Sequence, residues 1–486
     1  MLENSSHSSE PPASVSVSPI ALSSLASPMP TSSVADSIKT STLSALQQAQ
    51  ASCEAGDWSA TMAACESAIA ACESAIAQQV SIQNLFNTAE ALQQQGNISE
   101  AVRAYLKILQ QQPRTYRVYT RLRYNLMRYD IDEGDPILQE IVEGCQAIVD
   151  STPGFQAAQV TLGYGLTKLG KTQAATECYR QASRLVTQRR SALTDNNNPA
   201  HESAAAALLS NPAAKLAVES APDLENSRCS PDFVVIGAEK CGTTSLFQYL
   251  SQHPEILSPI EKEIDFFDEE YKHGLNWYLA HFPALPVHAP TQPGALALHQ
   301  VIGETSANYL YHNLAPARIF ECFPKIQLVV LLRHPVDRTI SRYNMMVRNG
   351  SETRTLEAAF AQALRQIEKA TTPDGIAWAV LNRCRHIGNS LYYYHLQRWL
   401  SYFPLKQLLV LPSEALFADP AQTLSELCRT LKIDSPPPNQ TYAKYNAGDY
   451  SAVSPAVRHR LNAFYQPYVG KLEALLSQSF AWELSA

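Results

Sequence analysis

A short apolar strand that runs into a glycine-containing loop and then into a helix most constrains the fold of this chain. The stretch DFVVIGAEKCGTTSL, residues 232–246, has four apolar residues before Gly237, and Gly242 then opens a helical segment. This geometry aims backbone N–H groups at an anion. A nucleotide-hydrolysing P-loop has lysine directly after its second glycine. Here that position is Thr243, and Lys240 stands two residues before Gly242. The loop therefore predicts a phosphate site of another kind.

Further apolar runs predict that this strand belongs to a parallel sheet. FVVIGA (233–238), QLVVLLR (327–333) and QLLVLPSE (407–414) are each followed by helix-like sequence. Strands alternating with helices are typical of α/β folds, whose parallel sheets are buried on both faces. We expect a mostly parallel sheet flanked by helices, as in P-loop proteins.

The preceding part of the chain predicts an all-α region of helical repeats. Residues 85–113 and 154–183 superimpose without gaps, with small and large side chains in register. This pattern resembles the tetratricopeptide repeat. An earlier repeat centres on Gly56, and its second helix carries ACESAIA twice in tandem over 64–77. A plain helical bundle with chance periodicity is the alternative.

These patterns divide the chain into four parts. Residues 1–40 are rich in Ser, Pro and Ala, which predicts a disordered tail. Residues 41–190 hold the repeats, and the polar stretch 191–228 is a linker with a short helix at 204–209. The α/β domain spans 229–486.

Composition excludes several classes of protein. The chain has 486 residues, 38 basic and 45 acidic, for a net charge of −7, which lacks the basic excess of a nucleic-acid binder. Ten scattered cysteines without a CxxC pair argue against structural zinc and for a reducing compartment, so we expect a cytoplasmic protein without a metal. No apolar run approaches the roughly 18 residues of a membrane span.

A second motif, LLRHPVDRTISRY at 331–343, supplies groups for another phosphate. Arg333 leaves the carboxyl end of a predicted strand, where open α/β sheets bind ligands, and Ser341 follows on the next helix. An arginine and a hydroxyl together can hold a phosphate.

The two motifs together closely resemble the sulfotransferase family over roughly residues 230–485. G-x-x-K-x-G-T-T-S-L follows one strand, R-x-P-x-x-R-x-x-S-x-Y follows a later one, and E-I-x-F-F lies between them. The family takes sulfuryl groups from 3'-phosphoadenosine 5'-phosphosulfate (PAPS), a nucleotide with two phosphate groups. KEIDFFDEEYKHGLNWYLAHFP (262–283) and GETSANYL (303–310) look most like the heparan-sulfate-type carbohydrate sulfotransferases.

The resemblance assigns roles to residues of both motifs. Arg333 and Ser341 would hold the 3'-phosphate of the donor. Glu263 would be the general base and Lys240 the cation where charge grows on the departing phosphate, since in-line attack by an alcohol or amine needs both groups. Cys241 needs only to be small and is not expected to be a nucleophile. The loop around the 5'-phosphosulfate would comprise Lys240, Cys241, Gly242, Thr243, Thr244 and Ser245.

Some positions depart from the heparan-type pattern. Thr305 stands where those relatives often have lysine. The basic, glycine-rich C-terminal donor loop is not evident, and 442–461 occupies its place, with Lys444, Arg458 or Arg460 as candidates. His386 could touch the acceptor.

Three readings of the chain differ in class. The first is a PAPS-dependent sulfotransferase whose repeats recruit a protein partner or the acceptor, with residues 228–486 sufficient for donor binding. The second is a repeat scaffold with a catalytically silent nucleotide-binding module, in which Glu263 is one charge in an acidic run over 261–270. A P-loop kinase is disfavoured because no apolar strand ends in a metal-binding Asp. The acceptor stays open among saccharide, lipid alcohol and tyrosine, and the resemblance favours a saccharide hydroxyl or amine.

Overall fold

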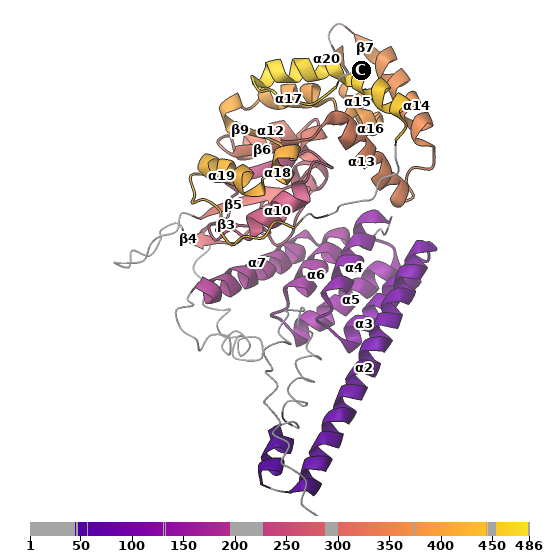
Figure 1. The fold of residues 1–486 in the computed structure, drawn as a ribbon, viewed down its shortest axis with the longest axis vertical. Coiled ribbons are helices and arrows are strands. Elements are labelled where there is room, and N and C mark those ends of the chain that lie inside the picture. Colours follow the sequence, from indigo (N-terminus) through magenta and orange to yellow (C-terminus); the bar gives the residue numbers. More distant parts are fainter. Residues whose placement is uncertain are drawn as a thin grey trace, which may run out of the picture. The chain divides into compact units, whose positions relative to one another are not determined.

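The computed structural model divides into two compact units, Met1–Val118 and Tyr119–Ala486. Figure 1 labels the helices and strands of the described residues. The predicted tail at 1–40, the helix at 204–209, Gly56 and Lys444 lie outside the described residues. The structure describes residues 44, 47–55, 57–129, 131, 133–194, 227–286, 300–372, 375–443, 445 and 453–484.

The first unit is helical in its described part. The N-cap Asp57 accepts a hydrogen bond from the backbone N–H of Ala60 at 2.9 Å, which satisfies a free donor at the start of the long helix α2. Phe86 of α2 and Tyr105 of α3 pack edge to face, with ring centroids 5.7 Å apart. The main helices are α2 (Trp58–Gln94) and α3 (Ile98–Gln111).

The second unit begins with further helices, and the unit boundary falls inside the first of them. Gly163 of α6 is required by close packing, because a Cβ there would lie 2.5 Å from Cε1 of Tyr179 in α7. This contact explains why a small residue at 163 accompanies a large one at 179. The all-helical region is confirmed, and its tetratricopeptide identity stays a prediction. The helices are α4 (Tyr116–Arg128), α5 (Pro136–Ser151), α6 (Gln156–Lys168) and α7 (Thr172–Thr194).

A five-stranded parallel sheet forms the centre of the second unit, in the order β3-β5-β2-β6-β9. All five residues of β2 are buried, as expected for a central strand covered on both faces. The mostly parallel sheet is therefore confirmed. Its strands are β2 (Phe233–Gly237), β3 (Ile256–Leu257), β5 (Val301–Thr305), β6 (Gln327–Leu332) and β9 (Leu408–Pro412).

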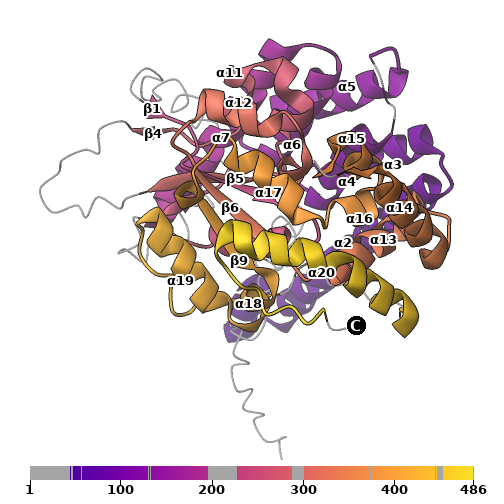
Figure 2. The same cartoon turned by 90° about the horizontal axis from the view of Figure 1, so that it is seen from above.

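Helices connect and cover these strands (Figure 2). Helix α10 contacts β3 and β5, α18 and α19 contact β9, and α17 packs along α20. The helices are α10 (Thr243–Ser251), α11 (Leu275–Leu279), α12 (Ala315–Cys322), α13 (Pro335–Arg348), α14 (Leu356–Ala370), α15 (Trp378–Arg383), α16 (Arg385–Gly388), α17 (Tyr392–Leu400), α18 (Ser413–Ala418), α19 (Pro420–Leu431) and α20 (Pro455–Leu476).

Small elements complete the second unit. Two antiparallel ribbons pair β1 with β4 and β7 with β8. Within the described part of the chain, no helix is both long enough and apolar enough to cross a bilayer. The ribbons and short turns are β1 (Ser227–Arg228), β4 (Leu285–Pro286), β7 (Thr371–Thr372), β8 (Gly375–Ile376), η3 (Phe266–Glu270), η4 (Tyr271–His273), η5 (Tyr309–Tyr311) and η6 (Leu405–Gln407).

Helices α4, α6 and α7 contact the part of the second unit that follows β3. Trp277 of α11 donates a hydrogen bond from Nε1 to Oγ1 of Thr167 at 3.2 Å. The ring of Tyr179 lies 5.5 Å from that of Trp277 and 4.0 Å from that of His281. The predicted boundaries at 190 and 228 stay predictions, and across them the helices and the sheet part share one compact unit.

Candidate active site

The loop after β2 has the backbone geometry of an anion site. Lys240 has φ = 71° and Gly242, the N-cap of α10, has φ = 92°. A side chain at Gly242 would be strained, and its Cβ would lie 2.9 Å from Cζ of Phe417. The first amides of a helix have no acceptor within the helix, so the start of α10 offers donors to an anion.

The second motif meets this loop at the carboxyl end of the sheet. Arg333 follows β6 and donates from Nη1 to the carbonyl of Lys240 at 3.4 Å, and Tyr392 donates its hydroxyl to the carbonyl of Arg333 at 3.0 Å. Ser341 lies on α13, one element further along. Residues 93 positions apart therefore share one edge of the sheet, as open α/β folds predict.

A cavity of about 510 Å³ brings together most of the predicted site. This volume lies within the ordinary range for small-molecule sites. Of the predicted residues it contains Lys240, Gly242, Thr243, Thr244, Glu263, Arg333 and Ser341. The other lining residues were not predicted to be site residues. They are Glu239, Ala307, Asn308, Asp337, Met345, Ser413, Glu414, Phe417 and Tyr445.

Cys241 and Ser245 are buried and do not line this cavity. The Cys241 thiol lies 3.6 Å from the hydroxyl of Tyr392, and burial raises the pKa of the thiol to about 11, so it is neutral at pH 7. Ser245 accepts a hydrogen bond from the backbone N–H of Tyr445 at 3.2 Å. Both residues support the loop in this structure.

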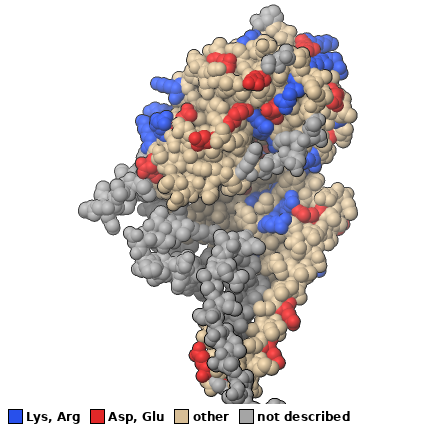
Figure 3. Space-filling model, in the orientation of Figure 1, with Lys and Arg blue, Asp and Glu red and all other residues tan. Residues whose placement is uncertain are grey.

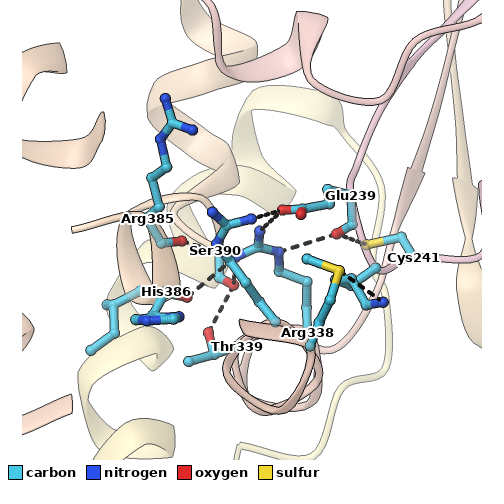
Figure 4. A network of polar contacts seen from close by, with 12 residues as sticks. Glu239, Cys241, Arg338, Thr339, Arg385, His386 and Ser390 are labelled. Atoms are coloured by element: carbon cyan, nitrogen blue, oxygen red, sulfur yellow. Dashed lines mark hydrogen bonds and ion pairs between the residues drawn. The ribbon is translucent and has the colours of Figure 1, made fainter. Parts of the chain in front are cut away.

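A buried ion-pair network connects the loop after β2 to helix α13 (Figure 4). The fully buried Arg338 donates from Nη2 to the carboxylate of Glu239 at 3.0 Å and from Nε to its carbonyl at 3.2 Å, and Arg342 donates to the same carboxylate. Burial alone would raise the pKa of Glu239, but Arg342 and Arg338 outweigh it and hold the pKa below its usual range. Arg338 also donates to the carbonyls of Arg385 and His386, both at 3.2 Å.

This network was not predicted, although both of its ends lie in the quoted motifs. Glu239 precedes Lys240, and Arg338 is the second arginine of R-x-P-x-x-R. Their side chains are paired across 99 positions, and the spacing of neither motif reveals that pairing.

The segment before η3 carries Glu263 into the cavity. Glu263 has φ = 62°, and its backbone N–H donates to the carbonyl of Thr305 at 2.9 Å. Its side chain is 45% exposed and contacts the ammonium of Lys262. Hydrogen bonds at 2.9 and 3.3 Å from the N–H groups of Phe266 and Phe267 to the hydroxyl of Tyr309 anchor the following turn. Glu263 therefore faces the cavity from a held segment.

Glu304, a second acid of the sequence motif, lies within β5 and is 1% exposed. Its carboxylate accepts hydrogen bonds from the hydroxyls of Tyr278 at 2.7 Å and Ser306 at 2.9 Å. Burial raises the pKa of Glu304 to about 7, against the effect of these bonds. It does not line the cavity, so it contributes to packing behind the site.

The raised pKa of the buried Glu304 predicts that the stability of the protein depends on pH. The pKa of Glu304 is about 7 in the folded protein and near 4.3 in the unfolded chain. The protonated carboxyl therefore contributes fully to the free energy of unfolding below about pH 4.3, and this contribution is lost as the pH rises through about 7. We expect Glu304→Gln to lessen the loss of unfolding free energy between pH 5 and pH 8 by about 2 kcal/mol. Thermal and urea unfolding at both pH values measure this loss, with the exposed Glu269→Gln as control. Equal losses in wild type and Glu304→Gln would contradict the assignment.

The C-terminal residues that were candidates for a donor contact lie in different positions relative to the cavity. Arg458 pairs with Asp337 of the cavity lining, Nη2 to Oδ1 at 2.8 Å, whereas Arg460 is exposed and outside the lining. The stretch that ends at Tyr445 is held on α10, because Tyr249 donates its hydroxyl to the carbonyl of Ala443 at 2.9 Å. Of the described residues of the predicted stretch, Tyr445 lines the cavity.

His386 lies away from the cavity lining, with Nε2 3.1 Å from Oε2 of Glu352. On the face shown in Figure 3, basic and acidic side chains are interspersed over the part that carries the sheet. Lys240 and Arg333 both line the cavity.

Comparisons with known proteins agree with the sequence motifs. The family model described as "Sulfotransferase domain" matches residues 230–447. A human bifunctional heparan sulfate N-deacetylase/N-sulfotransferase 3 is 34% identical over 209 residues, 42% of this chain and 22% of that protein. A mouse heparan sulfate glucosamine 3-O-sulfotransferase 6 is 29% identical over 276 residues, 52% of this chain and 74% of that protein.

The chain thus spans about a fifth of the human relative. Among solved structures, a sulfotransferase from Alicyclobacillus acidocaldarius is 27% identical, with 52% of this chain and 99% of that chain covered and a TM-score of 0.41. Residues 230–447 of this chain are therefore a sulfotransferase domain, with homologues among the heparan sulfate sulfotransferases.

Proposed function

We propose that this chain transfers a sulfuryl group from PAPS to a hydroxyl or amine of a saccharide, without a metal. The observation that carries the proposal is that Lys240, Glu263, Arg333 and Ser341 line one and the same cavity within the sulfotransferase domain. Lys240, Arg333 and Ser341 supply three anion-binding side chains, and the Glu263 carboxylate faces the same space.

The residues present fit a nucleotide with two phosphate groups. Gly242 keeps the loop open where a Cβ would meet Phe417, and the start of α10 offers backbone donors beside Lys240. Arg333 and Ser341 would hold the second phosphate from the neighbouring strand and helix. The donor would supply an activated sulfur and a phosphate leaving group.

In the proposed reaction, Glu263 takes the proton of the acceptor O–H or N–H as the acceptor atom bonds to sulfur. The bond between sulfur and the 5'-phosphate oxygen breaks, and Lys240 stabilises the charge that grows on that oxygen. The products are a sulfated acceptor and adenosine 3',5'-bisphosphate, with the proton left on Glu263.

The saccharide acceptor is proposed from the relatives, whose names specify heparan sulfate. A screen of the full chain with radiolabelled PAPS and glycan, lipid and tyrosine-peptide acceptors tests this choice. We expect label on the glycan class. Label on lipid or peptide alone would overturn the saccharide proposal, and donor binding without transfer to any class would favour a catalytically silent module.

The second phosphate site is tested by Arg333→Ala. Loss of a charged hydrogen bond should weaken binding of adenosine 3',5'-bisphosphate by about 1.5 to 3 kcal/mol, or roughly 10- to 150-fold. Titration calorimetry of the full chain measures the change, with the exposed Arg348→Ala as a control on the following helix. Unchanged affinity in Arg333→Ala would remove this residue from the site.

A further inference from the structure

The segment that carries Glu263 is held by helices from outside the sulfotransferase domain. We define residues 260–263 as the base segment. Gln156 at the start of α6 donates from Nε2 to the carbonyl of Ile260 at 3.5 Å, and the N–H of Ile260 donates to the carbonyl of His281 at 2.9 Å. At its other end the base segment is tied to β5 through the amide of Glu263.

The base segment also forms an ion pair with α4. Nε of Arg123 lies 3.8 Å from Oε2 of Glu261, and the two side chains are only 12% and 10% exposed. Arg123 also donates from Nη1 to Oγ1 of Thr161 on α6 at 3.2 Å, which fixes the direction of its guanidinium. Burial raises the pKa of the Glu261 carboxyl to about 7, and Arg123 counteracts that rise.

This ion pair bears on the position of the Glu263 carboxylate. Glu261 stands two residues before Glu263, and Glu263 has the left-handed backbone conformation that non-glycine residues rarely adopt. Such a conformation persists only where surrounding contacts hold it. If Arg123 were lost, the pKa of the Glu261 carboxyl would rise further, and the carboxyl would hold its proton or turn toward water, because a buried carboxylate without a nearby cation is costly.

We propose that Arg123 and Glu261 are positioning residues for Glu263, so that the helical repeats hold the general base of the sulfotransferase domain. This inference rests on the proposed function. It gives the repeats a role in catalysis in addition to any recruitment of partners. The remaining contacts of this face, between α7 and Trp277 and His281, hold the segment that follows the base segment.

The test compares Arg123→Met, Arg123→Lys and Glu261→Gln with the control Arg128→Met in the full chain. Arg128 is on the same helix but donates from Nη2 to the carbonyl of Asn349 at 2.6 Å, away from the base segment. We expect Arg123→Met to lower kcat by about 10- to 100-fold, the scale of a misplaced catalytic group, with KM for PAPS within about twofold. Arg123→Lys should recover part of kcat because it restores the charge.

Hydrogen exchange monitored by mass spectrometry gives a readout that needs no turnover. Amides of residues 260–263 should exchange about tenfold faster in Arg123→Met and stay at the wild-type rate in Arg128→Met, with residues 233–246 unchanged in both. Should Arg123→Met fail to fold, Glu261→Gln carries the same two measurements.

The outcomes separate this inference from the proposed function. Absence of transfer by wild-type protein would count against the function, and faster exchange in Arg123→Met would still support the hold on the base segment. Wild-type kcat and wild-type exchange in Arg123→Met would overturn the positioning role. An equal fall of kcat in Arg123→Met and Arg128→Met would overturn it too, as would a fall confined to donor affinity.

Discussion

Glu263→Gln is expected to lower kcat by about 10²- to 10⁴-fold while PAPS affinity stays within a few tenths of a kcal/mol. Glutamine keeps the size of the side chain and most of its hydrogen bonding but cannot take the acceptor proton. The proposed donor contacts come from the loop after β2 and from the residues that follow β6, which this change leaves intact. Steady-state kinetics and calorimetry on the same preparations measure both quantities.

Glu269→Gln is the matched control, because Glu269 lies in the same acidic run but is exposed and outside the cavity lining. It should retain the kcat of the wild type. A kcat for Glu263→Gln within about threefold of wild type would contradict the base assignment. Glu304 could not then take its place without movement, since it is buried behind the site with both carboxylate oxygens hydrogen-bonded.

Lys240→Ala is expected to change two quantities at once. The ammonium would contact phosphate in the ground state and the departing oxygen in the transition state, so donor affinity should fall by about 1.5 to 3 kcal/mol and kcat by about 10²-fold or more. Calorimetry with adenosine 3',5'-bisphosphate and single-turnover transfer from PAPS separate the two effects.

The contrast with Glu263→Gln makes this prediction specific. A Lys240→Ala variant that lost donor affinity but transferred at the wild-type rate when saturated would confine Lys240 to binding. A variant with normal affinity and normal kcat would remove it from the site.

The sequence predicted the central strands because their signals are local. β2, β6 and β9 are continuous apolar runs, each followed by a sequence with a helical pattern, and each strand was found where expected. β3 has two residues, and β5 contains Gly303 and Glu304, so neither reads as an apolar run. The strand needs glycine at position 303, because a Cβ there would lie only 2.1 Å from Cζ of Phe233, whose ring occupies that space.

The candidate site was predictable to the extent that its residues lie in short motifs. Lys240, Glu263, Arg333 and Ser341 do so, and the fold brings them to one cavity. The Glu239–Arg338 pair and the Arg123–Glu261 pair depend on packing between distant segments, which no local pattern encodes. Donor binding by residues 228–486 alone stays a prediction, and in the full chain those residues share their packing with α6 and α7.

Single-turnover transfer by the full chain tests most directly whether the protein moves a sulfuryl group from PAPS to a glycan. Radiolabelled PAPS is first bound to excess enzyme, a glycan acceptor is added, and sulfated acceptor and adenosine 3',5'-bisphosphate are quantified together. We expect the two products to appear at equal rates and in equal amounts, with both rates reduced about 10²-fold or more in Glu263→Gln. Label that stays on the bound donor with glycan, lipid and peptide acceptors alike would contradict this expectation.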